Sequence, residues 1–381
     1  MSTTVCLNAN TLAYPTGGGH RWVFLNWAMG LRANGCRVIW MEGAVPSWGT
    51  ARTRELIDLL KDQLRPYGFA ESLAIYSFYD EPLHPGAADG CFDLDAASSA
   101  ADLLVEIAYG SRQAVIDRFR RSALIDIDPG ILQLWVSAKQ IAIARHDTYF
   151  TIGETVGQPG SNLPDVGLRW HYTPPCVSLE AWRPSPVVAR APFTTVSQWE
   201  GGDWMLHGED SYSNEKRDGF QPYLDLPAMT RQPLELALGL GTAAAAEDGE
   251  ERMLIGKGWR VRHADEVTAT PWDYQRYLQN STGEFSCCKP SCVRLQNAWI
   301  SDRTICYLAS GRPAVVQHTG PSRFLPDASG LFRFKTPEEA ARMLDRVAGD
   351  YERQSANARA LAEEFFDAAK IAKRLLEIAL A

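Results

Sequence analysis

The sequence predicts an α/β protein with two domains, each built on a parallel β-sheet. The chain has 381 residues, and at roughly 150 residues per domain this length suggests two domains. Residues 4–42 have the pattern of a strand, a glycine turn, a helix and a second strand, a unit that builds parallel sheets. A Pro-rich stretch follows the first half, and the strand pattern restarts at residues 193–199.

In the first half, strands alternate with helices and loops. A buried strand at Thr4–Leu7 leads into the turn at Gly17–His20, and apolar residues at helical spacing then continue to Asn34. Further strands are expected at 37–42, 73–78, 103–107, 123–128, 149–152 and 168–173, with a helix at 57–64 and a loop at 80–95. Loops at the carboxyl ends of such strands are where these folds accept substrates.

The second half repeats the alternation of strands and helices, with different turn and loop residues between them. Its first strand, 193–199, is followed by Gly201-Gly202, which mirrors the strand and glycine turn of the first half. We expect a strand or short helix at 234–240, a strand at 259–262, helices at 272–278 and 304–309, a strand at 311–320, and loops at 212–219 and 242–251. Thr336-Pro337-x-Glu339 predicts a helix start, and the apolar stripe that includes Leu361 and Ile371 predicts a helical end.

These patterns give a division of the chain. We expect a first domain at 1–180, a Pro-rich linker at 181–191, a second domain at 192–365 and a C-terminal helix at 366–381 that can cross back to the first domain.

Composition and charge narrow the class of function. Hydrophobic residues make up 45% of the chain and charged residues 22%, as in ordinary globular proteins. The formal net charge is −8 and no Lys- or Arg-rich run is present, which argues against a nucleic-acid partner or an anionic membrane surface. No apolar run reaches the ~20 residues of a membrane span, and the N-terminus lacks the pattern of a signal peptide. We therefore expect a cytoplasmic protein.

The cysteines predict no metal site. The chain has eight, scattered except for Cys287, Cys288 and Cys292. A zinc site would need a second pair at a suitable spacing, so reduced, buried thiols are the expectation.

The stretch Gly17-Gly18-Gly19-His20 carries the strongest chemical prediction. A glycine turn lets backbone approach a ligand closely, and the following helix offers unpaired N–H groups to an anion. The stretch lacks the full G-x-G-x-x-G spacing and the lysine of a P-loop, so the histidine is what makes it specific. An imidazole at the mouth of a sheet, oriented by a carboxylate, can take a proton from a hydroxyl near neutral pH. The alternative is that His20 caps the helix or packs near its start.

Two aspartates are candidates for orienting that imidazole. Asp126 and Asp128 lie two residues apart on the strand 123–128 and therefore share one of its faces. A carboxylate at the carboxyl end of this strand, beside the glycine turn, is in a position to orient His20. The alternative for each is a solvated turn aspartate before Pro129.

The two α/β halves, the turn at Gly17–His20 and the block from Leu308 to Val316 followed by Thr319-Gly320-Pro321-Ser322 resemble the GT-B glycosyltransferases. The resemblance covers nearly the whole chain in architecture, although specific motifs are confined to the two glycine turns and residues 301–322. It implies two Rossmann-like β/α/β domains that face each other across a cleft, with the donor held mainly by the second domain and the acceptor by the first. In inverting members a histidine after the first strand is the general base and a later aspartate orients it, which matches His20 with Asp128 or Asp126.

The resemblance also implies a set of binding residues. The departing diphosphate needs N–H groups, hydroxyls and cations. On the donor side we expect Ser197, Lys216, Arg217, Glu284, Ser286, Lys289, Ser301, Arg303, Thr319, Gly320 and Ser322, and on the acceptor side Gly17, Gly18, Gly19 and Glu154. Enzymes of this fold generally work without a bound metal, so the resemblance implies no metal and no cofactor besides the nucleotide-sugar co-substrate. Retaining members commonly place a glutamate after the second glycine turn, whereas Thr319–Arg323 is followed by no acid before Asp327.

The function expected from the sequence is transfer of a sugar, with inversion, from a nucleotide-diphosphate sugar to a hydroxyl or amine of a small acceptor. The alternatives are a sugar-nucleotide 2-epimerase of the same fold and a non-catalytic sugar-nucleotide-binding partner. An NAD(P) oxidoreductase would require Glu42 to bind the ribose. Four aromatic residues, Tyr76, Phe78, Tyr79 and Tyr109, would suit stacking on an acceptor ring, or would simply pack. The nucleotide, the sugar and the oligomeric state stay open.

Overall fold

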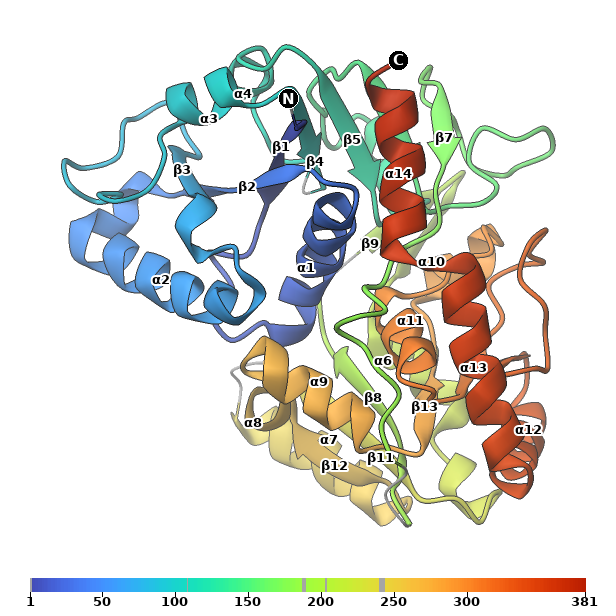
Figure 1. The fold of residues 1–381 in the computed structure, drawn as a ribbon. Coiled ribbons are helices and arrows are strands. Elements are labelled where there is room, and N and C mark those ends of the chain that lie inside the picture. Colours follow the sequence, from blue (N-terminus) through green and yellow to red (C-terminus); the bar gives the residue numbers. More distant parts are fainter. Residues whose placement is uncertain (1, 108, 187–189, 203, 240–243) are drawn as a thin grey trace.

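A computed structural model of the chain describes residues 2–107, 109–186, 190–202, 204–239 and 244–381. Two parallel sheets, each covered by helices, form two α/β domains, as Figure 1 shows. The predicted fold class is confirmed. Part of the predicted linker, residues 187–189, lies outside the described residues.

The first sheet has the strand order β3-β2-β1-β4-β5-β6-β7, and all its neighbouring strands are parallel. Its strands are β1 (Thr4–Ala9), β2 (Arg37–Ala44), β3 (Leu73–Ser77), β4 (Leu103–Glu106), β5 (Ser122–Asp126), β6 (Thr148–Thr151) and β7 (Trp170–Tyr172). Its helices are α1 (Gly18–Ala33), α2 (Gly49–Leu64), α3 (Leu94–Ala100), α4 (Gln113–Ile116) and α5 (Ile131–Ser137). Every residue of β1 is buried, as expected for a central strand covered on both faces.

The second sheet has the order β12-β11-β8-β13-β14-β15 and is also parallel. Its strands are β8 (Phe193–Gln198), β11 (Leu234–Gly239), β12 (Arg260–His263), β13 (Gly283–Ser286), β14 (Ala314–Gln317) and β15 (Leu331–Phe334). Its helices are α6 (Lys216–Phe220), α7 (Ala244–Gly256), α8 (Ala264–Thr268), α9 (Pro271–Gln279), α10 (Pro290–Leu295), α11 (Asp302–Ala309) and α12 (Pro337–Gly349). Short 3₁₀ turns lie at Pro46–Trp48, Arg65–Tyr67, Ala70–Ser72, Gln221–Tyr223 and Leu226–Ala228.

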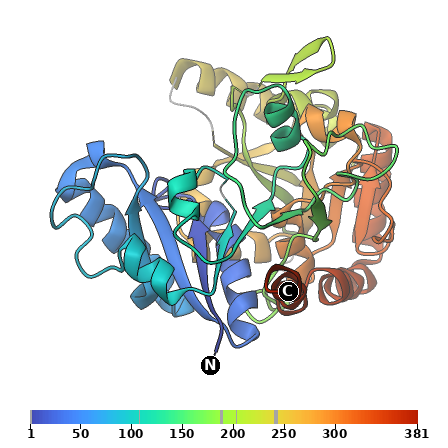
Figure 2. The same cartoon turned by 90° about the horizontal axis from the view of Figure 1, so that it is seen from above.

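Two local expectations were wrong. Residues 242–251, expected as a loop, belong from Ala244 onward to helix α7, because alanine and glutamate favour helices. The stretch 212–219 is not a solvated loop but the end of strand β10 and the start of helix α6. After Gly201-Gly202, strands β9 (Trp204–His207) and β10 (Asp210–Ser213) form a hairpin. In Figure 2 this hairpin, in yellow-green, projects away from the body of the molecule.

The C-terminal segment joins the two domains. Helix α13 (Tyr351–Phe365) lies on the second domain, and α14 (Ala368–Ala379) packs against α1 of the first, where Asn34 Nδ2 donates to the Ala369 carbonyl at 2.8 Å. A Cβ on Gly30 would lie 2.5 Å from the Ala368 carbonyl oxygen, so only glycine permits this helix contact. The chain crosses between the domains twice, side by side, since Val177 and Asp367 form a parallel β-bridge.

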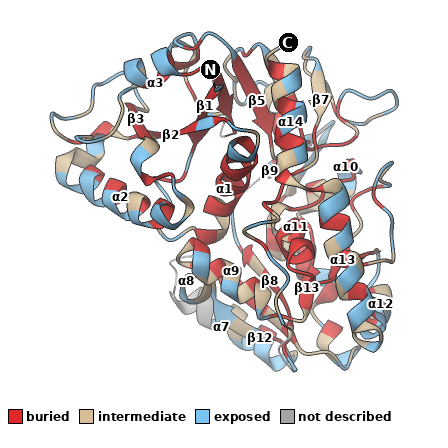
Figure 3. Ribbon diagram, viewed as in Figure 1, coloured by how far each residue is buried: buried red, intermediate tan, exposed pale blue. Residues whose placement is uncertain are grey.

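The buried residues follow this arrangement. Figure 3 shows that the central strands β1 and β13 and the helices α1 and α11 are largely buried, whereas α2, α12 and α13 each present an exposed face. Within the described part of the chain, no helix is long and apolar enough to cross a membrane.

Candidate functional site

The glycine turn begins α1 at the place where the two domains meet. A Cβ on Gly18 would overlap the carbonyl oxygen of Thr270, and one on Gly19 would lie 2.6 Å from the ring of Tyr274. Trp22 Nε1 donates to the Pro271 carbonyl at 2.7 Å. Gly18 and Gly19 therefore let the second domain approach α1 closely. The sequence suggested close approach by a ligand, and the structure shows close approach by α9 and the residues before it.

His20 stands in the first turn of α1, half-buried between the rings of Tyr14 and Phe24 at centroid distances of 5.0 and 5.2 Å. Its Nε2 lies 2.6 Å from the carbonyl oxygen of Asn10. A carbonyl can only accept, so Nε2 carries the proton and Nδ1 keeps a free electron pair. Burial is the largest influence on the imidazole and lowers its pKa below the ordinary 6.5, although the Asn10 carbonyl and the Glu42 and Asp128 carboxylates act in the opposite direction. The ring is therefore neutral at pH 7 and able to accept a proton.

The two predicted aspartates differ in their surroundings. Asp126 is buried and accepts hydrogen bonds from Gln133 Nε2 at 2.7 Å, Thr151 Oγ1 at 2.8 Å and the Asp128 amide at 2.9 Å. Burial raises the pKa of Asp126 to about 6. Its carboxyl thus organises the turn that follows β5, and none of its bonds goes to the imidazole.

Asp128 is exposed at the carboxyl end of β5 and accepts from the Tyr109 hydroxyl at 3.4 Å. Its charge acts on groups of both domains. In the first domain, the Asp128 carboxylate favours a higher pKa for His20. In the second domain, burial raises the pKa of Asp302 to about 6 and also raises the pKa of Cys292, and the Asp128 charge contributes to both shifts. Asp128, rather than Asp126, therefore lies in the region between the domains, within electrostatic reach of the histidine.

Lys216 is the most unusual cation of the second domain. The residue is only 8% exposed, and its Nζ lies 6.0 Å from the centroid of the Trp299 ring. Among the described residues, no carboxylate or hydrogen-bond acceptor pairs with this ammonium group. Burial lowers its pKa, and the thiols of Cys288 and Cys292 oppose that shift. A buried, unpaired cation is costly unless an anion joins it, so Lys216 is the best candidate for binding a phosphate.

Two of the other predicted cations already have anionic partners. Arg217 Nε lies 2.7 Å from Glu250 Oε1, and Arg303 Nε lies 2.8 Å from Glu284 Oε1. Arg303 also donates to the Val196 carbonyl at 2.7 Å, so the Arg303–Glu284 pair ties α11 to β8 and β13. The structure thus uses these groups to hold the second domain together.

The remaining donor-side residues gather at the carboxyl edge of the second sheet. Ser197 and Ser286 lie at the ends of β8 and β13, Lys289 is the N-cap residue of α10, and Ser301 caps α11 by accepting from the Arg303 amide at 3.2 Å. After β14, Thr319 Oγ1 donates to the Trp299 carbonyl at 2.6 Å, and Gly320 has a φ of 122° that favours glycine. These residues therefore lie at one edge of the second sheet, whereas Glu284 lies within β13 and Ser322 contacts Glu154 of the first domain.

Glu154 and Ser322 join the two domains instead. Glu154 is 2% exposed, and its carboxylate accepts from Ser322 Oγ at 2.7 Å and from the backbone and side chain of Arg323. Next to it, Asn297 Nδ2 donates to the Pro129 carbonyl at 2.7 Å, and the Glu154 amide donates to the Asn297 carbonyl at 3.2 Å. We call Glu154, Ser322, Arg323 and Asn297 the interdomain clasp.

We expect Glu154→Gln to loosen this clasp. The amide would place an N–H₂ group against donors that the carboxylate now satisfies, at a cost of ~1–3 kcal/mol. The midpoint of thermal unfolding should fall, and the radius of gyration from small-angle scattering should increase as the domains separate. Ser322→Ala removes one of the donors to Glu154, together with the hydroxyl that accepts from the Phe324 and Leu325 amides, and the radius of gyration should increase less than in Glu154→Gln. A Glu154→Gln protein with wild-type midpoint and radius would show that the clasp does not hold the domains.

Glu42, the residue on which a dinucleotide site would depend, is not free to bind a ribose. It is 1% exposed and accepts from the Thr11 amide at 2.8 Å, the Leu12 amide at 3.1 Å, Trp40 Nε1 at 2.8 Å and the Thr11 hydroxyl. These donors fix the loop after β1 and satisfy the carboxylate.

The cysteines are all unpaired thiols, and Cys287 and Cys288 are buried. Across the described ranges, no three His, Cys, Asp or Glu side chains are grouped so as to hold a metal ion.

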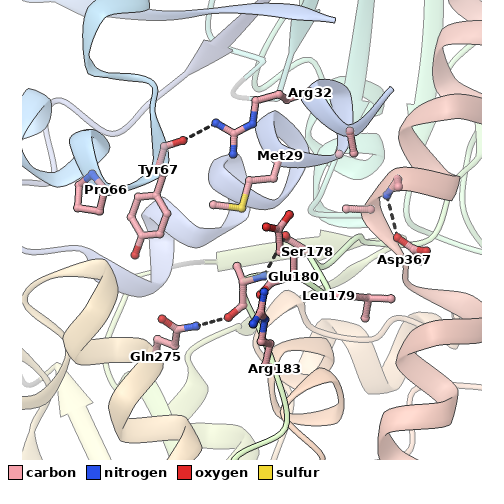
Figure 4. A pocket seen from close by; sticks show the side chains of 15 residues that line it. Met29, Arg32, Pro66, Tyr67, Ser178, Leu179, Glu180, Arg183, Gln275 and Asp367 are labelled. Carbon is pink, nitrogen blue, oxygen red and sulfur yellow. Dashed lines mark hydrogen bonds between the residues drawn. The ribbon is translucent and has the colours of Figure 1, made fainter. Parts of the chain in front are cut away.

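Two cavities bear on where a ligand could bind. One of them, about 620 Å³, lies between the C-terminal half of α1, the segment 178–183 and the start of α14, and Figure 4 shows Met29, Arg32 and Gln275 among its lining. None of the predicted site residues lines it. A much smaller cavity, about 50 Å³, lies at the carboxyl ends of the first sheet's strands and is lined in part by Asn8, Glu106 and Ser111. Sequence reasoning missed these three, although Asn8 and Glu106 are polar residues in otherwise apolar strands.

No protein-family model matches the chain, and no curated protein sequence matches it significantly. Solved structures do. The structure of HepE from Anabaena in complex with UDP and glucose is 11% identical, with 100% of both chains covered and a TM-score of 0.58. An alpha-glucosyltransferase in complex with UDP-glucose and DNA gives the same identity, coverage and TM-score. Sucrose-phosphate synthase from Thermosynechococcus elongatus is 12% identical over 99% of this chain and 98% of its own, with a TM-score of 0.55. The chain therefore has the two-domain, parallel-sheet fold of these glycosyltransferase structures.

Proposed function

We propose that the protein is a glycosyltransferase that moves a sugar from a nucleotide-diphosphate sugar, with UDP as the nucleotide, to a hydroxyl or amine of a small acceptor. The proposal rests on two groups: a neutral histidine in the first domain, and a buried lysine in the second domain that has no ion-pair partner among the described residues. Asp128 acts electrostatically on both His20 and Cys292, and Cys292 in turn acts on Lys216. UDP as the nucleotide is supported by the HepE and alpha-glucosyltransferase structures, which hold UDP or UDP-glucose.

The chemistry assigns one role to each of these two groups. His20 Nδ1 takes the proton of the acceptor hydroxyl as its oxygen attacks the anomeric carbon, and the Asn10 carbonyl holds the opposite ring nitrogen in place. The bond from the anomeric carbon to the phosphate oxygen breaks, and the nucleoside diphosphate leaves with the electron pair. Lys216 stabilises the charge on the diphosphate, and Asp128 stabilises the imidazolium. We expect the reaction to proceed without a metal because Lys216 supplies this positive charge.

A base on the acceptor side suits a single displacement, so we propose inversion at the anomeric carbon. The acceptor is proposed to be small and not a nucleic acid, since the chain carries a net charge of −8.

The test combines binding with product analysis. Calorimetry and thermal shift against UDP, GDP, dTDP and ADP, with NAD(P) as the control, should show UDP binding and a raised melting temperature by mass action. With UDP-glucose and a panel of sugar and amine acceptors, NMR of the product should show an inverted anomeric linkage. Failure of every nucleoside diphosphate to bind would contradict the proposal. A retained linkage would exclude inversion, and a new sugar nucleotide formed without acceptor would indicate an epimerase.

A further inference from the structure

The small cavity of about 50 Å³ lies where acceptors are expected in the first domain. It is formed by the carboxyl ends of β1, β2, β3 and β4 and the residues that follow them. The residues that matter for the argument are Asn8, Asn10, Tyr76, Phe78, Glu106 and Ser111. A water molecule occupies about 30 Å³ in the liquid, so the cavity holds a group of one or two heavy atoms and not a whole ring.

Two side-chain oxygens of residues that line this cavity accept no hydrogen bond among the described residues, Asn8 Oδ1 and Glu106 Oε2. Asn8 is 1% exposed, and its Nδ2 donates to Ser111 Oγ at 2.6 Å. Its Oδ1 accepts from no group among the described residues. Buried amide oxygens are normally paired, so this atom points to a hydrogen-bond donor that arrives with a ligand.

The Glu106 carboxylate is engaged on one oxygen. Glu106 is fully buried, and its Oε1 accepts from the Ser111 amide at 2.8 Å. Its Oε2 lies 2.9 Å from Nε2 of the buried His146 but forms no hydrogen bond with it. A carboxylate on the ligand would face Glu106, so an anionic group is disfavoured. An uncharged hydroxyl can donate to the open Asn8 Oδ1.

The cavity adjoins the proposed base. Asn10 lines it, and the carbonyl of the same residue holds His20 Nε2 at 2.6 Å. The cavity and His20 therefore share one neighbouring residue, Asn10.

Aromatic rings lie beside the cavity. Phe78 lines it and meets the ring of Tyr79 edge-on at 5.3 Å, and Tyr79 is 52% exposed. A Cβ on Gly43 would lie 2.8 Å from the Phe78 ring, so glycine is needed for that ring to sit there. Aromatic faces of this kind pack against the C–H face of a sugar ring.

We propose that this cavity takes the primary hydroxyl of a hexose acceptor, with Asn8 Oδ1 accepting its hydrogen bond and the sugar ring lying outside against Phe78 and Tyr79. The identification of the ligand as an acceptor rests on the glycosyltransferase function proposed above. Asn8 is then a specificity-determining residue, since it selects acceptors that carry this hydroxyl, and a different hydroxyl of the same sugar reacts at His20.

Matched pairs of probes test the proposal without any transfer reaction. Methyl α-D-glucopyranoside and methyl α-D-galactopyranoside are compared with their 6-deoxy counterparts by saturation-transfer NMR titration. We expect at least one 6-hydroxy probe to bind the wild-type protein ~10-fold more tightly than its 6-deoxy partner, the loss expected for one buried hydrogen bond. Equal binding within both pairs, or no binding by any probe, would overturn the proposal. This test uses the wild-type protein alone, so it does not depend on whether a variant folds.

Asn8→Ala assigns the effect to one atom. In this variant the two members of the pair should bind alike, whereas Asn280→Ala, at an exposed position in the second domain, should keep the wild-type difference. A difference that persists in Asn8→Ala would show that another group accepts the hydroxyl. UDP calorimetry on the same samples reports separately on the proposed function, because UDP binding does not need this cavity.

Discussion

Replacing His20 by alanine is expected to lower the rate of sugar transfer by ~10²–10⁴-fold, the usual contribution of a general base. The imidazole is neutral and its Nδ1 is free, so its loss leaves the acceptor hydroxyl with no group to take its proton. UDP should still bind with wild-type affinity, since Lys216 is unchanged. The measurement is kcat for transfer from UDP-glucose beside a UDP titration by calorimetry.

His20→Gln separates catalysis from a structural role. The glutamine amide can donate to the Asn10 carbonyl as Nε2 does, but it cannot accept a proton at neutral pH. The glutamine variant should therefore be as slow as the alanine variant, and recovery of activity in it would show that His20 only holds the loop.

The pH profile gives a further check on His20. Burial lowers the pKa of the imidazole below 6.5, and only the neutral form acts as the base. The rate should be constant at neutral pH and fall as the pH drops below that lowered pKa. A rate that increases on acidification would contradict the assignment.

The fold could be predicted from the sequence because its signals are local. Glycine turns, strand alternation and the capping box at Thr336 each depend on a few neighbouring residues. Helix α7 shows the limit of this approach. We expected residues 242–251 to form a loop because they are rich in alanine and acidic residues, whereas the helix propensity of alanine and glutamate favours a helix.

The candidate site was harder to predict, because the type of each residue is read directly from the sequence but its partner in an ion pair or hydrogen bond is not. Lys216 and Arg217 are adjacent and look alike in the sequence, yet Arg217 is neutralised by Glu250 and Lys216 has no such partner among the described residues. Likewise Glu154 meets Ser322 from the opposite domain. No spacing rule reports contacts between residues so far apart in the chain.

Asn8 illustrates a second reason why a candidate site residue was not predicted from the sequence. A polar residue near the end of a buried strand gives a weak signal, and its meaning depends on which strands lie beside it. The register places Asn8 next to Glu106 on β4 and Met41 on β2, which the sequence of β1 alone does not determine. The cavity beside Asn8 could therefore be identified only once the order of the strands was known.

Replacing Lys216 by methionine is expected to weaken UDP binding by ~10–100-fold, as for the loss of one charge-assisted contact. Methionine has a similar shape and no charge, so it fills the buried site without the cost of an unpaired ammonium group. The variant should therefore unfold at a midpoint no lower than wild type. Arg217→Met is the matched control. The Arg217 side chain forms an ion pair with Glu250, so its loss should leave the affinity for UDP unchanged. Equal affinities in wild type and Lys216→Met would remove Lys216 from the donor site.

The protonation of Lys216 provides an independent measurement of the same contact. Burial lowers the pKa of this lysine in the free protein, and a bound diphosphate favours its charged form and raises that pKa again. Between the two values, UDP binding must take up a proton, and the affinity must fall as the pH rises through the lower one. Calorimetry in buffers of different ionisation enthalpy detects this uptake. The uptake should disappear in Lys216→Met and persist in Arg217→Met, because only a lysine that meets the diphosphate can link proton binding to nucleotide binding.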